Sequence, residues 1–257
     1  MLDDGAATTV EMWGERGPVM LCVHGITSSR RSWARFAERL GTTHRVLAYD
    51  QRGHGDSAAV RGPMTLAQSV RDLQTVARSV SEPVDTLLGH SWGGAVVLLG
   101  GLELRPARVI AIDPMLTVAP GTFQTDYVED LSDFFATAPA DRDESIRAMY
   151  AGLAPLDLDG KVHAMRAMSV ASLERLGREN NVDAGGWNVR ERSASYPVPL
   201  LVLAAGIESV MSADDLTFLR ERGGANVRIQ SFPREGHNLH RTAFDEFADA
   251  VASFVET

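Results

Sequence analysis

The stretch that decides the fold of this chain is Gly-His-Ser-Trp-Gly-Gly at residues 89–94. It follows the short apolar run 84–89 (VDTLLG) and precedes an apolar segment with helical periodicity at 92–104. A serine in a G-x-S-x-G pattern between a strand and a helix occupies a sharp turn, which exposes its hydroxyl above the edge of a sheet. The helix N-terminus supplies N–H groups for a developing oxyanion. Ser91 is therefore the candidate nucleophile.

Strand-like and helix-like segments alternate on both sides of this turn. The expected strands are 8–13 at an edge, 19–23, 45–50, 84–89, 108–113, 199–205 and 226–232. The expected helices are 32–40, 65–80, 92–104, 212–222 and 243–255. Alternation of this kind predicts crossover units and an α/β fold, with a mostly parallel sheet that carries helices on both faces.

The pattern changes between residues 115 and 196, where only helical periodicity is found. One expected helix carries a repeat at Phe123, Tyr127, Leu131 and Phe135. A second expected helix carries a mixed face at Val162, Met165, Ser169, Ser172 and Leu176. We therefore expect a helical cap at 115–196, inserted into an α/β core made of 1–114 and 197–257.

Composition bounds the class of protein. The chain has 257 residues, a net charge of −9 and 44% hydrophobic residues, which is typical of a globular protein. Its acidic balance disfavours nucleic acid and anionic membranes as partners. The N-terminus lacks the apolar stretch of a signal peptide, so we expect a cytoplasmic protein. The single cysteine, Cys22, excludes an internal disulfide and a cysteine-based zinc site.

Three further motifs follow expected strands. They are His-Gly-Ile at 24–26, Asp-Gln-Arg-Gly-His-Gly-Asp-Ser at 50–57, and Gly-His at 236–237. Together with 89–94, and in this order, these motifs resemble the α/β-hydrolase superfamily, in its serine-nucleophile branch with a helical cap. The resemblance covers nearly the whole chain and implies an α/β-hydrolase fold that transfers acyl groups to water.

The resemblance also implies roles for individual residues. Ser91 matches the nucleophile and His237 the general base, with His240 as a rival. The backbone N–H groups of Ile26 and Trp92 match the oxyanion hole. No cofactor or metal is expected, because the chain shows neither metal-ligand spacing nor a phosphate-binding loop.

The acid of the triad departs from the common pattern. Family members usually carry an aspartate at the position that Ser209 occupies here, and a serine cannot hold an imidazolium as a carboxylate can. Asp113, at the end of the strand after the nucleophile's helix, is the favoured substitute. Glu208 is the alternative acid, and a chain with no functioning acid is the third possibility.

The remaining histidines have simpler interpretations. His24 is expected to brace the backbone of the oxyanion loop, and His54 to be structural. We expect His90 beneath the nucleophile turn or on the pocket floor. His44 and His163 stand in polar surroundings and are expected to be solvated.

Several groups of cap residues are candidates for the pocket. The methionines and aromatic residues are Met115, Met149, Met165, Met168, Phe134, Phe135 and Trp187, each more simply explained as filling the interface between cap and core. The arginines that could bind a substrate carboxylate are Arg30, Arg31, Arg142, Arg147, Arg166, Arg175, Arg178, Arg190 and Arg192, although solvated helix faces explain most of them.

A serine nucleophile excludes the aspartate-dependent epoxide hydrolases and dehalogenases of the superfamily. The favoured function is hydrolysis of a small or medium carboxylic ester through an acyl-enzyme with a Ser-His-Asp triad. Cleavage of an amide or of a β-diketone C–C bond is the alternative within the fold, and a ligand-sensing protein with little turnover is the alternative of another class. The expected partner is a small acyl substrate, without nucleic acid or membrane, and self-association into a homo-oligomer is left open.

Overall fold

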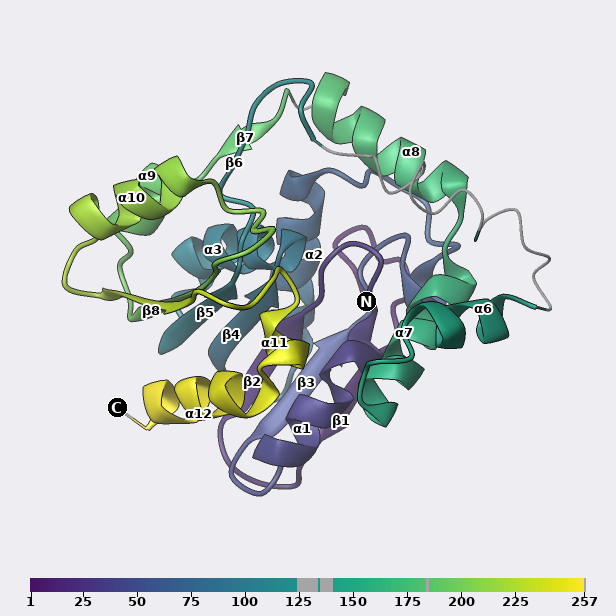
Figure 1. Cartoon of the computed structure of the whole chain (residues 1–257), viewed down its shortest axis with the longest axis horizontal. Coiled ribbons are helices and arrows are strands. Elements are labelled where there is room, and N and C mark those ends of the chain that lie inside the picture. The colour runs from purple at the N-terminus through teal and green to yellow at the C-terminus, as the bar shows by residue number, and fades with distance from the viewer. Residues whose placement is uncertain (124–133, 135–140, 184, 257) are drawn as a thin grey trace.

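The computed structural model describes residues 1–123, 134, 141–183 and 185–256 (Figure 1). Its strands are β1 (Val10–Trp13), β2 (Val19–Val23), β3 (Arg45–Tyr49), β4 (Val84–His90), β5 (Arg108–Ile112), β6 (Thr117–Val118), β7 (Trp187–Asn188), β8 (Leu200–Ala205) and β9 (Val227–Phe232). Its α-helices are α1 (Ala34–Leu40), α2 (Leu66–Ser79), α3 (Trp92–Leu104), α6 (Arg142–Met149), α7 (Pro155–Ala167), α8 (Val170–Arg178), α9 (Arg190–Ala194), α10 (Ala213–Arg222), α11 (Leu239–Thr242) and α12 (Phe244–Val255).

Seven of the described strands form one sheet in the order β1-β3-β2-β4-β5-β8-β9. Only β1, at one edge, runs antiparallel to its neighbour within this sheet. The interior strands β2, β4, β5 and β8 are almost entirely buried, which explains their continuous apolar runs without alternation. The predicted fold class, an α/β fold with a mostly parallel sheet, is confirmed.

Helices cover both faces of the sheet. One apolar cluster joins the sheet to α2 and α3, and a second joins the opposite side to α1 and α12. Figure 1 shows α1 and α12 in front of the strands and α2 and α3 behind them. Apolar residues at helical spacing on α2, such as Leu66, Val70 and Leu73, form the face buried against the sheet.

The order of the strands brings chain-distant loops together at one edge of the sheet. His90 of β4 pairs with Ile112 of β5, so Ser91 and Asp113 each follow the end of a paired strand. β8 lies on the other side of β5, and Asp113 N–H donates to the carbonyl of Leu203 at 2.7 Å. In an open α/β sheet, ligands bind outside the carboxyl ends of the strands, and this edge is therefore the candidate site.

The inserted segment, residues 115–196 between β5 and β8, is not entirely helical. Thr117–Val118 and Trp187–Asn188 pair as the short antiparallel strands β6 and β7, so the expectation of helices alone was wrong. Two-residue strands leave no periodic signal in a sequence, which is why they were missed. The expected repeat from Phe123 to Phe135 lies mostly outside the described residues.

The second expected helix of this segment is in fact two helices. α7 ends at Ala167, and α8 begins at Val170 after the N-cap Ser169, whose side chain accepts the N–H of Ser172 at 3.2 Å. A serine hydroxyl competes with the helix for backbone N–H groups and favours a helix start over a helix interior. The mixed face predicted across Ser169 was therefore wrong.

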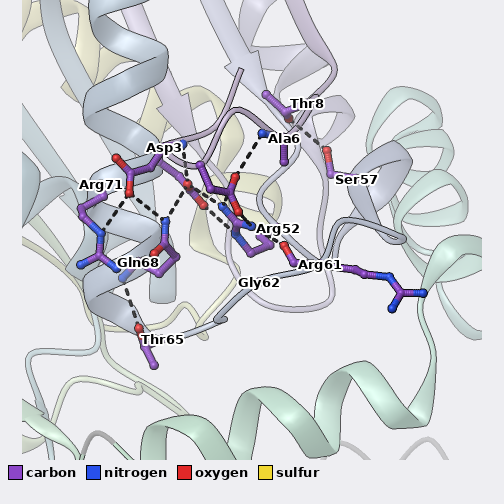
Figure 2. Close-up of polar contacts among 12 residues, drawn as sticks. Asp3, Ala6, Thr8, Arg52, Ser57, Arg61, Gly62, Thr65, Gln68 and Arg71 are labelled. Atoms are coloured by element: carbon purple, nitrogen blue, oxygen red, sulfur yellow. Dashed lines mark hydrogen bonds and ion pairs between the residues drawn. The ribbon is translucent and has the colours of Figure 1, made fainter.

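A polar network fixes the N-terminal segment and the loop after β3 to helix α2. Figure 2 shows Arg52 at its centre, close to Asp3 and Gln68. The Arg52 guanidinium donates to Asp72 at 3.0 and 2.9 Å and to Asp4 at 2.8 Å, and only 2% of its side chain is exposed. The arginine of the 50–57 motif therefore holds a loop in place.

Among the described helices, none is both long enough and apolar enough to cross a bilayer.

Candidate active site

Ser91 sits on a strained turn between β4 and α3. Its backbone has φ 58° and ψ −119°, a conformation that a non-glycine residue adopts only where its surroundings enforce it. Its N–H donates to the carbonyl of Ile112 at 2.9 Å, which ties the turn to β5. A Cβ atom on Gly93 would lie 2.3 Å from the carbonyl oxygen of Val23, so only glycine allows this approach of α3 to β2.

Asp113 and His237 form a hydrogen-bonded pair. The imidazole Nδ1 lies 2.7 Å from Asp113 Oδ2, and because a carboxylate only accepts, Nδ1 carries the proton. The fully buried Asp113 also accepts from Ser209 Oγ at 2.6 Å, Val210 N–H at 3.1 Å and Ala205 N–H at 3.3 Å. These donors compensate for the hydration that the carboxylate loses on burial. The supporting role of Ser209 was not anticipated from the sequence.

The alternative acid, Glu208, and the rival base, His240, do not take part in this hydrogen bond. Glu208 is exposed, and no ion pair of the described residues includes it. His240 is buried between the rings of Trp33 and His90, with centroids 5.6 and 4.2 Å away. Burial lowers the pKa of His240 well below its usual range, so this imidazole is neutral and packs between the two rings.

The loop after β2 lies directly against the nucleophile. A Cβ atom on Gly25 would be 3.1 Å from Ser91 Cβ. His24 braces this loop as expected, since its Nδ1–H donates to the carbonyl of Gly25 at 2.8 Å and its Nε2 accepts the N–H of Gln51 at 3.1 Å. Among the hydrogen bonds of the described residues, none uses the backbone N–H of Ile26.

Two other histidines also have structural surroundings. The buried His54 Nδ1–H donates to the carbonyl of Arg52 at 3.0 Å. The Nε2–H of His90, beneath the nucleophile turn as expected, donates to the carbonyl of His237 at 2.9 Å and so positions the backbone of that histidine. Burial holds the pKa of His90 far below its usual range.

A cavity of about 400 Å³ opens above these residues. Among the residues that line it are Ile26, Ser91, Tyr150, Lys161, His237 and Arg241. Ser91 and His237 therefore share one cavity with three residues of the inserted segment, Tyr150, Leu153 and Lys161. A serine, a histidine oriented by a carboxylate and a preformed cavity together allow nucleophilic acyl transfer.

The model of the alpha/beta hydrolase family matches residues 20–250 of the chain. The chain belongs to this family. Its similarity to the 30 kDa subunit of magnesium chelatase from Rhodobacter capsulatus, 32% identity over 101 residues, covers 39% of this chain and only 36% of that relative. A longer match, to protein phosphatase methylesterase 1 from Mus musculus, has 24% identity and covers 94% of this chain and 76% of the relative.

Solved structures show the same fold as this α/β hydrolase. The N-formylmaleamic acid deformylase from Pseudomonas putida has a TM-score of 0.76 and 18% identity, with 95% of each chain covered. The enol-lactonase from Burkholderia xenovorans has a TM-score of 0.72 and 21% identity, with 97% of this chain and 96% of that chain covered. Family and relatives together support a hydrolase.

The cavity of this α/β hydrolase contains two cationic side chains that the sequence did not single out. Lys161, on α7, is 6% exposed, and Arg241, on α11, is 8% exposed. Neither position carries a recognisable motif. A lysine between Gly160 and Val162 on a weakly amphipathic helix gives no signal that it is buried.

Most of the expected pocket residues pack elsewhere. Phe134, Met165 and Met168 are buried in a separate apolar cluster, Met115 belongs to the core, Trp187 packs on Trp92, and Met149 is 49% exposed. Phe135 lies outside the described residues. Among the candidate arginines, Arg30, Arg147, Arg166, Arg175 and Arg190 have carboxylate partners.

His163 was expected to be solvated, but it is bound on both sides of its ring. Its Nδ1 lies 2.9 Å from Ser29 Oγ and its Nε2 lies 3.1 Å from Asp56 Oδ1, so it connects α7 to the core. Asp50, Asp56 and His163 come close enough together to hold a metal ion. However, the Arg30 guanidinium pairs with both carboxylates and already balances their negative charge. These residues therefore join α7 to the loops of the core.

A larger cavity of about 840 Å³ lies at the opposite end of the sheet, where β2 and β4 begin. Its charged side chains include Arg45 and Glu82, which pair with each other at 2.7 Å. It contains no serine–histidine pair among the residues that line it. Of these two cavities, the smaller one, which Ser91 and His237 line, is therefore the candidate active site.

Proposed function

We propose that this protein is a serine hydrolase that cleaves a small or medium carboxylic ester through an acyl-enzyme. The observation that carries the proposal is the Asp113–His237 hydrogen bond of 2.7 Å next to a cavity that Ser91 also lines. The names of two similar proteins, a methylesterase and an enol-lactonase, are those of enzymes that act on esters. They support ester hydrolysis as the reaction.

In the proposed reaction, Ser91 Oγ attacks the carbonyl carbon of the ester while its proton passes to His237 Nε2. The bond from Asp113 keeps the imidazole in the tautomer whose Nε2 can accept this proton. The tetrahedral intermediate then collapses, the C–O bond to the alcohol breaks, and the alcohol leaves with the proton from His237. Water repeats the sequence on the acyl-enzyme, so that the carboxylic acid leaves and Ser91 recovers its proton.

The oxyanion of each intermediate needs donors that are already in place. We assign this role to the backbone N–H groups of Ile26 and Trp92. Trp92 is the first residue of α3, whose N-terminal N–H groups have no partner within the helix. One such donor is typically worth about 10²–10³ in rate. We further propose that the inserted segment acts as a cap, because Tyr150 and Lys161 form part of the cavity wall.

A direct test is labelling with a fluorophosphonate, combined with turnover of p-nitrophenyl butyrate. We expect label on Ser91 and turnover, both abolished in Ser91→Ala and both retained in Ser195→Ala, which changes an exposed serine. Label without turnover of esters, amides or β-diketones would favour a ligand-sensing protein. The absence of both label and turnover would overturn the proposal.

Amide hydrolysis is the second candidate. The structure of the N-formylmaleamic acid deformylase shares this fold over 95% of the chain, and its name is that of an enzyme acting on an amide. An amide leaving group needs protonation more than an alcohol does, and His237 would supply that proton. Comparing kcat/KM for an ester and an amide of the same acyl group decides between the two.

A further inference from the structure

Two positive side chains from different parts of the chain meet in the cavity of Ser91. Lys161 comes from α7 of the inserted segment, and Arg241 comes from α11, four residues beyond the candidate base His237. Burial and then the charge of Arg241 lower the pKa of Lys161, and both cations contribute, after burial, to the low pKa of His240. The cavity therefore concentrates positive charge beside the nucleophile, although the whole chain carries a net charge of −9.

The partners of these cations are polar but uncharged. Lys161 Nζ donates to the carbonyl of Thr27 at 3.0 Å and to its hydroxyl at 3.2 Å. Arg241 donates to Asn238 Oδ1 at 3.2 Å and to Ser28 Oγ at 3.3 Å. The Nε of Arg241 is buried without a hydrogen-bond partner.

No ion pair of the described residues includes Lys161 or Arg241. The carboxylate of Asp157 attracts Arg241 without a direct ion pair. This carboxylate, however, is bound to Arg35 at 3.0 Å. Within the part of the chain that the structure describes, the two cavity cations thus have no carboxylate in direct contact.

Burying a positive charge without an anion in contact is unfavourable. Burial lowers the pKa of Lys161 to about 7 and lowers that of Arg241 as well. A neutral glutamine at 161 could make the same hydrogen bonds to Thr27 without this cost. The charges are therefore explained better by an anion that enters the cavity than by a purely structural role.

We propose that Lys161 and Arg241 together bind a carboxylate of the substrate, so that the substrate is an acyl compound with a second, anionic carboxylate group. Arg241 offers a planar set of donors and Lys161 a compact charge, a combination suited to a carboxylate. The cavity of about 400 Å³ accommodates a small half-ester of a dicarboxylic acid. This inference names the substrate class of the proposed hydrolase and rests on that function.

A matched pair of esters tests the inference. p-Nitrophenyl hemisuccinate and p-nitrophenyl butyrate have acyl chains of the same length and differ in the terminal carboxylate. We expect the wild type to prefer the hemisuccinate in kcat/KM by about 10- to 100-fold, the worth of hydrogen bonds to a charged group. No preference for the hemisuccinate in the wild type would overturn the inference.

Variants locate the source of that preference. Lys161→Gln and Arg241→Gln should lose most of this preference, mainly through a higher KM for the hemisuccinate. Arg166→Gln is the matched control, because Arg166 is exposed and pairs with Asp143 outside the cavity. Retained preference in both cavity variants would overturn the assignment to these residues. Circular dichroism checks folding, and Lys161→Arg keeps the charge if Lys161→Gln fails to fold.

A binding experiment separates this inference from the proposed function. Titration of Ser91→Ala protein with succinate, followed by calorimetry, needs no turnover. We expect succinate to bind more tightly than butyrate, and Arg241→Gln in the same background to remove the difference. Turnover of the butyrate without succinate binding would overturn the substrate class alone. Succinate binding without turnover of any ester would overturn the proposed function and leave the carboxylate site standing.

Discussion

The Ser209 hydroxyl donates to Asp113 Oδ1 at 2.6 Å, while His237 Nδ1 donates to the other oxygen of the same carboxylate at 2.7 Å. Relatives that this chain resembles usually carry their acid at the position of Ser209. Here the carboxylate stands on the neighbouring strand β5, and the residue left at the usual position supports it. Asp113, directly after β5, is therefore the carboxylate that contacts the imidazole, and Ser209, after β8, contacts that carboxylate.

This relationship predicts that the two positions can exchange roles. Asp113→Ser together with Ser209→Asp should recover at least about 10² of the activity that Asp113→Ser alone loses. Ser209→Asp in the otherwise unchanged chain should lower activity, since two carboxylates would then compete for one site. The measurement is kcat for p-nitrophenyl butyrate in all three variants. A double variant no better than Asp113→Ser would show that only β5 can present the acid.

A pair of isosteric substitutions tests whether Asp113 or Glu208 is the acid of the triad. Asp113→Asn should lower kcat by about 10⁴ without unfolding the protein, because the amide favours the wrong imidazole tautomer. Glu208→Gln should leave kcat within about twofold, since Glu208 is exposed. Steady-state kinetics measures kcat for both variants, and thermal unfolding shows whether each variant is folded. The reverse outcome would identify Glu208 as the acid.

The pKa of Lys161, lowered to about 7, predicts a pH dependence that only anionic substrates show. The protonated lysine binds the carboxylate, so KM for the hemisuccinate should rise as the pH increases above about 7 and Lys161 loses its proton. The groups that face it are Thr27, Tyr150, His240 and Arg241. Of these, the imidazole is already neutral and the guanidinium stays charged across this range.

Any pH effect that both esters share cancels in the ratio of their kcat/KM values, so this ratio isolates the lysine. We expect this ratio to fall above pH 7 in the wild type and to be flat in Lys161→Gln. A ratio independent of pH in the wild type would contradict the role given to Lys161.

The close approach of α3 to β2 predicts an unequal response to two glycine substitutions. Gly93→Ala would place its Cβ 2.3 Å from a backbone carbonyl oxygen, which cannot move independently of the sheet. We expect a loss of about 2–3 kcal/mol in the free energy of unfolding and a large loss of activity. Gly152→Ala, whose Cβ meets no atom within 4 Å, should change stability by less than about 0.5 kcal/mol. Urea unfolding measures both, and equal effects would contradict the packing argument.

Local sequence was sufficient for most of the core. The strand 19–23 and the helix 92–104 were predicted with their observed bounds, because both are almost continuously apolar and such runs reflect burial directly. The candidate residues Ser91, Asp113 and His237 also came from their positions after expected strands. The inserted segment was predicted less well, since the break at Ser169 and the β6–β7 pair depend on single hydrogen-bonding contacts.

The sequence by itself thus determined the α/β architecture and the residues that stand at its carboxyl edge, because hydrophobic periodicity and glycine-dependent turns are local properties of the chain. Only the tertiary structure decided that Asp113 contacts His237 and that Ser209 supports it. It likewise decided that Lys161 and Arg241 share the cavity of Ser91. These contacts join residues far apart in the chain, and their spacing in sequence carries no information about which loops the order of the strands brings together.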